Sequence, residues 1–202
     1  MVYWNYITNT EDRSLRQNKV IVITGAAGTG KTTVQKFLLK EFGLKRVLTH
    51  TTRPARVNEQ NGVDYYFETD DSFERNHYLE RVSYSGYQYG SSTEALQQAW
   101  AQGPVATIVL ETLGAITYAE KLGDQAVILF MTVRNQAQLK ERMQIRGDNP
   151  KMIAKRLGSK EHARDLAMPE ELKGKAIEID NTDWSVTKQK LTELVKRLQD
   201  GD

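Results

Sequence analysis

The sequence KVIVIT at residues 19–24 runs directly into GAAGTGKT at residues 25–32, and this junction decides the fold class. The first stretch is β-branched and lacks alternating polar positions, which predicts a strand buried on both faces, as in a parallel sheet. The second fits the pattern G-x-x-x-x-G-K-[ST], and apolar residues at helical spacing follow it until Gly43. A strand, a glycine-rich loop and a helix in this order predict a phosphate-binding loop.

Each residue type in this loop has a physical role in holding phosphate. Consecutive backbone N–H groups converge on the anion, and glycines let the backbone approach it without a Cβ clash. We expect Lys31 to reach the β- and γ-phosphates and Thr32 to hold Mg²⁺. An ordinary glycine-rich turn with an exposed lysine is the alternative, but it does not explain the flanking strand and helix. The residues expected to contact ATP here are Gly25, Ala26, Ala27, Gly28, Thr29, Gly30, Lys31, Thr32 and Thr33.

Strand and helix patterns alternate along the rest of the chain. Buried strands are predicted at 46–48, 105–110, 126–133 and 176–180. Helices are predicted at 114–122, 135–145 and 150–166, and a last helix places Leu191, Leu194, Val195 and Leu198 on one face. This alternation predicts an α/β fold with a mostly parallel sheet. Residues 50–92 are polar and rich in aromatics, break the rhythm, and are interpreted as an inserted domain.

Composition excludes several other classes of protein. The 202 residues suit one domain or one core with insertions, and the 27% charged fraction is ordinary for a globular chain, which excludes wholesale disorder. No apolar run approaches the roughly 20 residues of a membrane span. The absence of cysteine excludes disulfides, and a net charge of +2 argues against a nucleic-acid partner. Residues 1–17 do not resemble a secretory signal, so we expect an N-terminal extension on a cytoplasmic protein, as a monomer or homodimer.

A second candidate site follows at residues 50–56, HTTRPAR. Arg53 and Arg56 are three residues apart in a short polar loop, so their guanidinium groups can converge on one phosphate dianion. A solvated basic loop has the same composition. The stretch by itself therefore leaves a phosphate site and a solvated loop open.

The longer stretch TTRPARVNEQNGVDYYF at residues 51–67 closely resembles the signature of the guanylate kinase family. The phosphate loop, YGSS at 89–92, RMQIRG at 142–147 and AKRL at 154–157 follow the family order. The resemblance covers about residues 19–198 and implies ATP-dependent phosphorylation of GMP to GDP with Mg²⁺. It also implies a three-layer α/β/α core made of 18–49, 93–142 and 168–202, a mixed α/β insertion at 50–92 that binds GMP, and a helical lid at 143–167.

The resemblance also assigns expected roles to individual residues of this chain that match site positions of the family. The resemblance places Arg53, Arg56, Tyr65 and Tyr89 on the GMP phosphate, Thr49, Glu80 and Ser91 around the guanine, and Glu111 next to GMP and the metal. It places Asn181 near the adenine of ATP. The residues expected to act on the transferring phosphoryl group are Lys31, Arg53, Arg142, Arg146 and Arg156. Arg142 and Arg146 lie four apart, hence on one helix face, where ordinary solvated charges are the alternative.

Glu80 has a chemical reason to select guanine. Guanine presents N1–H and N2–H₂ as adjacent donors, and a carboxylate offers two adjacent acceptors. The same carboxylate would meet the N1 lone pair of adenine, which disfavours that base. A surface glutamate beside a strand is the alternative.

The sequence also departs from the family pattern after the strand at 105–110. Similar kinases carry an I-L-D-x-D run followed by Gln-Gly, whereas this chain has Val109 and Glu111 at the two aspartates and Leu113 at the glutamine. Glu111 keeps an acid that can orient Mg²⁺, but Val109 cannot. These changes leave two alternatives open: a related nucleoside monophosphate kinase with a shifted base preference, and a non-catalytic guanylate-kinase-like binding module. The intact Lys31-Thr32 pair argues against the second.

Overall fold

The computed structural model describes residues 18–55, 59–84, 86–135, 137–145, 147 and 149–200. Its centre is a five-stranded parallel sheet in the order β2-β7-β1-β8-β9. These strands are β2 (Lys45–Arg46), β7 (Val105–Val109), β1 (Lys19–Thr24), β8 (Ala126–Thr132) and β9 (Ala176–Asp180). The predicted parallel sheet is confirmed, and the phosphate loop leaves its central strand.

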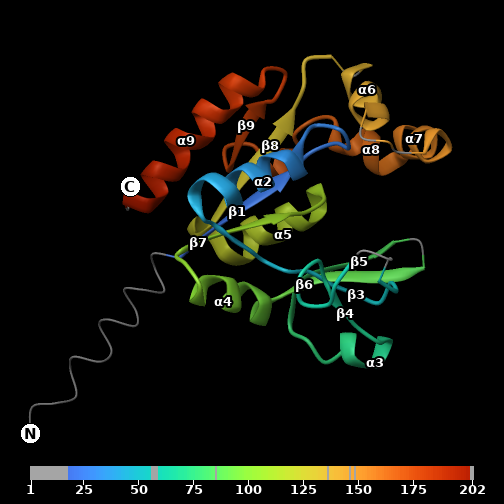
Figure 1. Cartoon of the computed structure of the whole chain (residues 1–202), viewed down its shortest axis with the longest axis vertical. Coiled ribbons are helices and arrows are strands. Elements are labelled where there is room, and N and C mark those ends of the chain that lie inside the picture. The colour runs from blue at the N-terminus through green and yellow to red at the C-terminus, as the bar shows by residue number, and fades with distance from the viewer. Residues whose placement is uncertain are drawn as a thin grey trace, which may run out of the picture.

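Alternate residues of β1 bury themselves against opposite layers of helices. Val20 and Val22 pack with helices α4 (Thr93–Ala101) and α5 (Thr112–Leu122), and Ile21 and Ile23 pack with α2 (Lys31–Phe42) and α9 (Trp184–Asp200). All four side chains are fully buried. Because both faces are covered, the core has the predicted three α/β/α layers, as Figure 1 shows.

A second, four-stranded sheet lies beside this core in the order β4-β3-β6-β5. Its strands are β3 (His50–Thr51), β4 (Tyr66–Phe67), β5 (Tyr78–Tyr84) and β6 (Tyr87–Ser92), with the short helix α3 (Asp70–Phe73) beside them. β3 runs parallel to β4 and antiparallel to β6. α5 packs directly on β5, so the second sheet meets the core on the side that α5 covers (Figure 1).

The buried imidazole of His50 fixes the beginning of this second sheet. Its Nδ1 lies 2.8 Å from Oε1 of Glu68 and its Nε2 lies 2.8 Å from Oγ of Ser92. Ser92 is also the N-cap of α4, because its hydroxyl accepts from the Ala95 N–H at 3.1 Å. One hydrogen-bond network therefore connects the first residue of β3, where the chain enters the second sheet, with the last residue of β6, where the chain leaves it.

Three short helices follow β8: α6 (Ala137–Ile145), α7 (Pro150–Leu157) and α8 (Lys160–Asp165). The sequence predicts one helical stretch at 150–166, and the structure divides it. The hydroxyl of Ser159 accepts from the His162 N–H at 3.1 Å and starts a new helix there. Leu139, Met143 and Ile153 pack with Ala26, so α6 and α7 rest on the phosphate loop.

Two further differences from the predicted elements are small. The strand predicted at 46–48 is Lys45–Arg46, although the Val47 N–H still donates to the Thr107 carbonyl at 3.0 Å. A pair of short helical turns, Gly123–Gln125 and Glu170–Leu172, precedes β8 and β9. Among the described residues, every helix is too short or too polar to cross a bilayer. The predicted extension at 1–17 lies outside the described residues.

Candidate nucleotide site

The phosphate loop joins β1 to α2 in a conformation that only glycine adopts easily. Gly25, Gly28 and Gly30 have φ angles of 122°, 87° and 95°. A Cβ on Gly25 would collide with the Met131 carbonyl, and one on Gly30 would collide with the amide of Asn181. The glycines therefore allow both the left-handed turn and the close packing of the loop against β8 and the end of β9.

Lys31 and Asn181 brace this loop from two directions. Nζ of Lys31 donates to the carbonyl oxygens of Gly25 at 2.5 Å and Ala26 at 3.0 Å, so the ammonium lies over the loop. Nδ2 of Asn181 donates to the Thr29 carbonyl at 2.8 Å. Arg142 Nη2 in turn donates to the backbone oxygen of Asn181 at 2.9 Å. The loop lysine, one arginine of α6 and the asparagine after β9 thus form one connected group.

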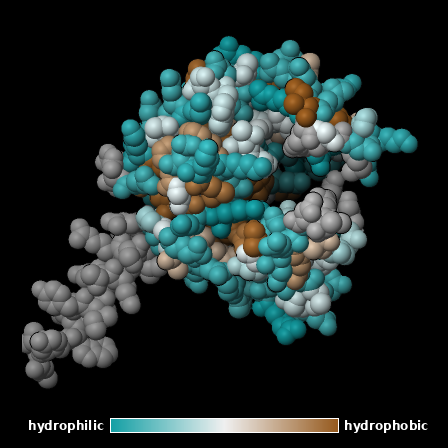
Figure 2. Space-filling view, in the orientation of Figure 1, coloured by the Kyte–Doolittle hydropathy of each residue, from teal (hydrophilic) through white to brown (hydrophobic). Residues whose placement is uncertain are grey.

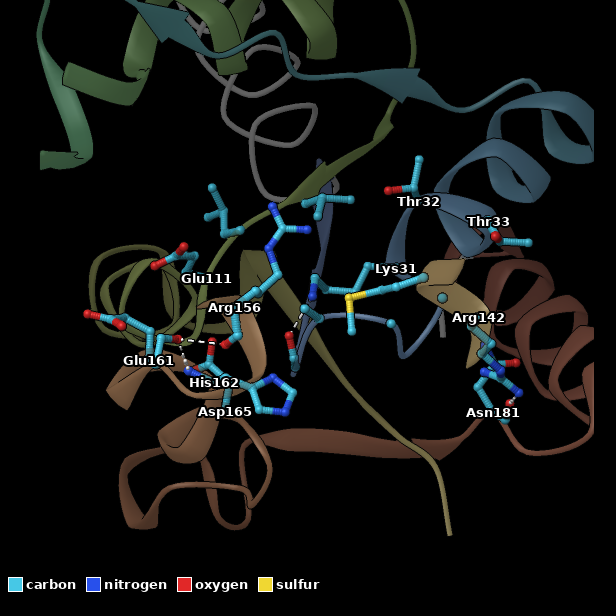
Figure 3. A pocket seen from close by; sticks show the side chains of 18 of the residues that line it. Lys31, Thr32, Thr33, Glu111, Arg142, Arg156, Glu161, His162, Asp165 and Asn181 are labelled. Atoms are coloured by element: carbon cyan, nitrogen blue, oxygen red, sulfur yellow. Dashed lines mark hydrogen bonds between the residues drawn. The ribbon is translucent and has the colours of Figure 1, made fainter. Parts of the chain in front are cut away.

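A cavity of about 920 Å³ opens in front of the loop, and residues of α6, α7 and α8 form part of its wall. Figure 3 shows Arg142, Arg156 and His162, one from each of these helices. That volume accommodates a nucleotide. The basic side chains on its wall are Lys31, Lys36, Arg142, Lys155 and Arg156, and the acidic ones are Glu111, Glu161 and Asp165. Because cations outnumber acids on this wall, the cavity suits a polyanionic ligand even though the whole chain is nearly neutral.

The acidic side of the cavity holds a chain of charges. Oδ1 of the buried Asp165 accepts from Nε of Arg164 at 2.7 Å, and Nη2 of Arg164 lies 3.8 Å from Oε2 of Glu111. Desolvation raises the pKa of Glu111, the Asp165 charge adds to this, and the charges of Arg164 and Lys31 oppose it. Arg164 and Lys31 therefore help keep Glu111 ionised at the cavity wall.

Glu80 lies on β5, facing α5, in the second sheet. Its Oε1 accepts from the Ser91 hydroxyl at 3.2 Å, and Ser91 accepts from the Tyr118 hydroxyl at 2.9 Å. Burial raises the pKa of Glu80 to about 7; the Ser91 hydrogen bond opposes the rise and the Glu111 charge adds to it. The Glu111 charge therefore influences the ionisation of Glu80, and of the two carboxylates Glu111 lines the cavity described above.

Arg53 is held inside the second sheet by an acidic partner. Its Nη2 lies 2.9 Å from Oε2 of Glu59, and its guanidinium sits 5.5 Å from the centre of the Tyr65 ring. Burial lowers the pKa of Arg53, but the hydrogen bond and the charge of Glu59, together with Tyr89, outweigh burial, so the pKa of Arg53 is raised. The arginine is thus charged, oriented and paired.

The predicted site residues fall into two groups in space. Those on the wall of the cavity are Gly25, Ala27, Gly28, Gly30, Lys31, Thr32, Thr33, Glu111, Arg142, Arg156 and Asn181. Ala26 and Thr29 face the other side of the loop. Those in or beside the second sheet are Thr49, Arg53, Tyr65, Glu80, Tyr89 and Ser91. Arg56 and Arg146 lie outside the described residues.

Sequence reasoning missed the residues of α8, which bring His162, Arg164 and Asp165 to the loop and to Glu111. No local pattern marks them, since a short stretch of mixed charges is typical of any solvated helix. The space-filling view shows a largely hydrophilic face with a hollow between the region of α6–α8 and the second sheet (Figure 2). In Figure 1, α6–α8 lie in the upper part of the view and the second sheet lies in the lower part.

Comparison with known proteins agrees with this architecture. A family model described as guanylate kinase matches residues 17–198. A guanylate kinase of Thermus thermophilus is 34% identical over 146 residues, covering 70% of this chain and 66% of that protein, and one of Neisseria gonorrhoeae is 34% identical over 153 residues, covering 73% and 74%. The match thus spans just under two thirds of the length of the Thermus relative.

A solved structure has the same fold. The crystal structure of guanylate kinase from Anaplasma phagocytophilum superposes with a TM-score of 0.62 at 21% identity, covering 89% of this chain and 84% of that one. Both sheets and the helices that cover them, except for the last two residues of α9, fall within the matched residues. With a family model matching nearly its whole length, the chain belongs to the guanylate kinase family.

Proposed function

We propose that this protein transfers the γ-phosphoryl group of ATP to GMP and releases ADP and GDP. One observation carries the proposal: a lysine-bearing phosphate loop faces a cation-lined cavity, and a desolvated carboxylate, Glu80, lies at the adjoining edge of the second sheet. The first feature suits a nucleoside triphosphate and the second suits a base with adjacent donors. Guanylate kinase relatives at 34% identity add support.

In this proposal the chain divides into three working parts. The core of 18–49, 93–142 and 168–202 holds ATP, the insertion at 50–92 holds GMP, and the lid at 143–167 closes over both. Packing of the lid residues Met143 and Ile153 on Ala26 supports a lid that is linked to the loop. Closure would exclude water and bring the two phosphates together.

The chemistry requires alignment and charge compensation. An oxygen of the GMP phosphate attacks the γ-phosphorus, the bond from that phosphorus to the bridging oxygen of ADP breaks, and ADP leaves with the electron pair. A dianionic acceptor has no proton to lose, so no side chain has to act as a base. Lys31, Arg142 and Arg156 would balance the charge on the transferring group, since all three line the cavity.

Mg²⁺ fits the residues that are present. Thr32 and Glu111 offer a hydroxyl and a carboxylate oxygen on the cavity wall, and Mg²⁺ prefers oxygen ligands. Mg²⁺ usually keeps several waters and is bound through one or two protein groups together with substrate phosphates. A bound Mg²⁺ would neutralise phosphate charge. Thr32 and Glu111 would orient it, although Val109 supplies no second carboxylate.

In the acceptor site, Arg53 would bind the phosphate of GMP and Glu80 would bind its base. Arg53 would exchange its Glu59 partner for the GMP phosphate, with Tyr65 and Tyr89 beside it. Glu80, kept in place by Ser91, would accept from N1–H and N2–H₂ of guanine. Thr49 lies at the start of the same sheet, where its carbonyl accepts from the Tyr66 N–H at 2.9 Å.

The proposal is tested by steady-state turnover with ATP and each of GMP, AMP, CMP and UMP. GMP should give the highest kcat/KM by a wide margin. Comparable turnover of another monophosphate would support the alternative that the changes at Val109 and Leu113 go with a different base preference. Binding of GMP without any ADP release would indicate a non-catalytic binding module.

A further inference from the structure

His162, on α8, is a buried polar group that the predicted reaction does not use. Its side chain is only 8% exposed, yet it lines the same cavity as the phosphate loop. Its Nδ1 is buried and has no hydrogen-bond partner among the described residues. Unpaired buried polar atoms are rare in native proteins, which points to a partner supplied by a bound ligand.

The position of the ring is fixed from the backbone side. The His162 N–H donates to Oγ of Ser159 at 3.1 Å, and the Ser159 hydroxyl donates to the Arg156 carbonyl at 2.9 Å. This cap anchors α8 directly after the arginine of α7. Figure 3 shows His162 and Asp165 next to each other on α8, on the side of the cavity that faces the loop.

Burial of the ring favours a neutral imidazole. Burial lowers the pKa of His162, the Asp165 carboxylate opposes this, and the Lys31 ammonium adds to it. Asp165 is already engaged by Arg164, whose Nη2 faces Glu111. A neutral imidazole can still donate one hydrogen bond, and beside a lysine-bearing phosphate loop the acceptor that fits is a phosphate oxygen.

We propose that the imidazole of His162 donates a hydrogen bond to a β- or γ-phosphate oxygen of the bound nucleoside triphosphate. The identity of this ligand rests on the proposed function. His162 then joins Lys31 as a direct phosphate contact, supplied from α8 opposite the loop. Its role differs from that of the lid arginines because it adds a donor without adding a charge.

Binding measurements on variants test this contact. His162→Ala should weaken binding of a non-hydrolysable ATP analogue by about tenfold, the loss typical of a hydrogen bond to a charged group, and leave GMP affinity unchanged. His162→Asn or His162→Gln, whose amides can stand in for Nδ1 or Nε2, should recover most of the loss. His77→Ala is the matched control, because His77 is exposed and paired with Glu94.

These measurements separate a phosphate contact from a structural role. Equal weakening of ATP analogue and GMP, or a loss that neither amide recovers, would overturn the proposal. If the wild-type protein does not bind the ATP analogue, the proposed function fails as well. If it binds the analogue, and Lys31→Ala weakens binding but His162→Ala does not, only the His162 contact is refuted.

Nuclear magnetic resonance of the side chains gives a second readout that does not depend on folding of a variant. The chain has 3 histidines, so ¹⁵N-labelled imidazoles give a simple spectrum. Saturation with the ATP analogue should shift the His162 ring nitrogens and leave those of His77 in place. Unchanged His162 signals in the saturated complex would contradict the contact.

Discussion

The phosphate loop and the Glu80 region handle two nucleotides in this account, and they are built in different ways. The loop draws its donors from consecutive residues whose glycines are packed against β8 and β9. The Glu80 region draws on β5, β6 and α5, which are distant in sequence, and its arginine is occupied by Glu59. In the proposed function, the ATP side would therefore draw its donors from one continuous stretch of chain, whereas the GMP side would draw them from separate elements and would exchange partners to bind.

The largest effect is expected on the loop side. Lys31→Ala should lower kcat by roughly 100-fold to 1,000-fold, since a lost transition-state charge contact typically costs about 3–4 kcal/mol. Lys40→Ala, which removes an exposed lysine of the same helix, is the control and should leave kcat unchanged. The thermal midpoint of both variants shows whether they are folded. Near-wild-type turnover of folded Lys31→Ala would contradict the assignment of this loop as the ATP phosphate site.

A smaller loss, confined to one nucleotide, is expected for the arginine of the second sheet. Arg53→Ala should weaken GMP by about tenfold or more, because hydrogen bonds to charged groups contribute roughly 1.5–3 kcal/mol. ATP affinity should hold, since Arg53 does not line the ATP cavity. Arg81→Ala removes an exposed arginine of the same sheet and serves as the control. Separate titrations that show equal losses for both nucleotides would contradict the division into two sites.

The raised pKa of Glu80 predicts a pH dependence on the same side. A pKa of about 7 means that the folded protein keeps this proton over a range in which the unfolded chain, with its ordinary value near 4.5, has lost it. The contribution of Glu80 to stability is therefore present at acidic pH and is lost as pH rises from about 4.5 through about 7.

Binding of GMP should change in the opposite direction. Guanine needs the ionised carboxylate, so GMP affinity should rise by about tenfold between about pH 6 and 8. The GMP affinity of Glu80→Gln, measured over the same pH range, gives the pH dependence that comes from ionisation of the GMP phosphate alone. Parallel pH profiles for wild type and Glu80→Gln would show that this carboxyl group does not face the base.

The smallest effect is expected for the brace of the loop. Asn181→Ala removes the buried donor to the Thr29 carbonyl, which should lower the unfolding free energy by about 1–3 kcal/mol. Denaturant unfolding measures this loss. Asn135→Ala, which removes the surface bond to the Ala137 N–H, is a milder comparison. If Asn181→Ala is as stable as wild type, the loop does not depend on β9 for its shape.

Sequence reasoning succeeded where the signal is local. The strand at 19–24, the glycine loop and the apolar face of Leu191, Leu194 and Val195 follow from spacing alone, and burial in the structure agrees. The resemblance to a family added the second sheet and the residues in it. Spacing could not have placed Glu80 beside Ser91 and Tyr118, since that contact depends on how α5 packs on β5.

The break between α7 and α8 has a local signal that the predicted helix at 150–166 overlooks, because Gly158 ends one helix and Ser159 caps the next. Other contacts could not be predicted from the sequence. The pairing of Arg53 with Glu59 and the line from Asp165 through Arg164 to Glu111 join charges that any solvated surface also carries. Such contacts are selected by tertiary packing, and local composition does not encode them.

The most direct test of the account is the ratio of kcat/KM for GMP to that for AMP, measured in wild type and in Glu80→Gln. A buried carboxylate that faces N1–H and N2–H₂ predicts a wild-type ratio far above one and a fall of at least about 100-fold in the variant, because a site built around such a pair strongly rejects the mismatched partner. Glu74→Gln, at an exposed position of the same region, should leave the ratio unchanged. A ratio that Glu80→Gln does not alter would contradict the account, because Glu80 would then not read the base.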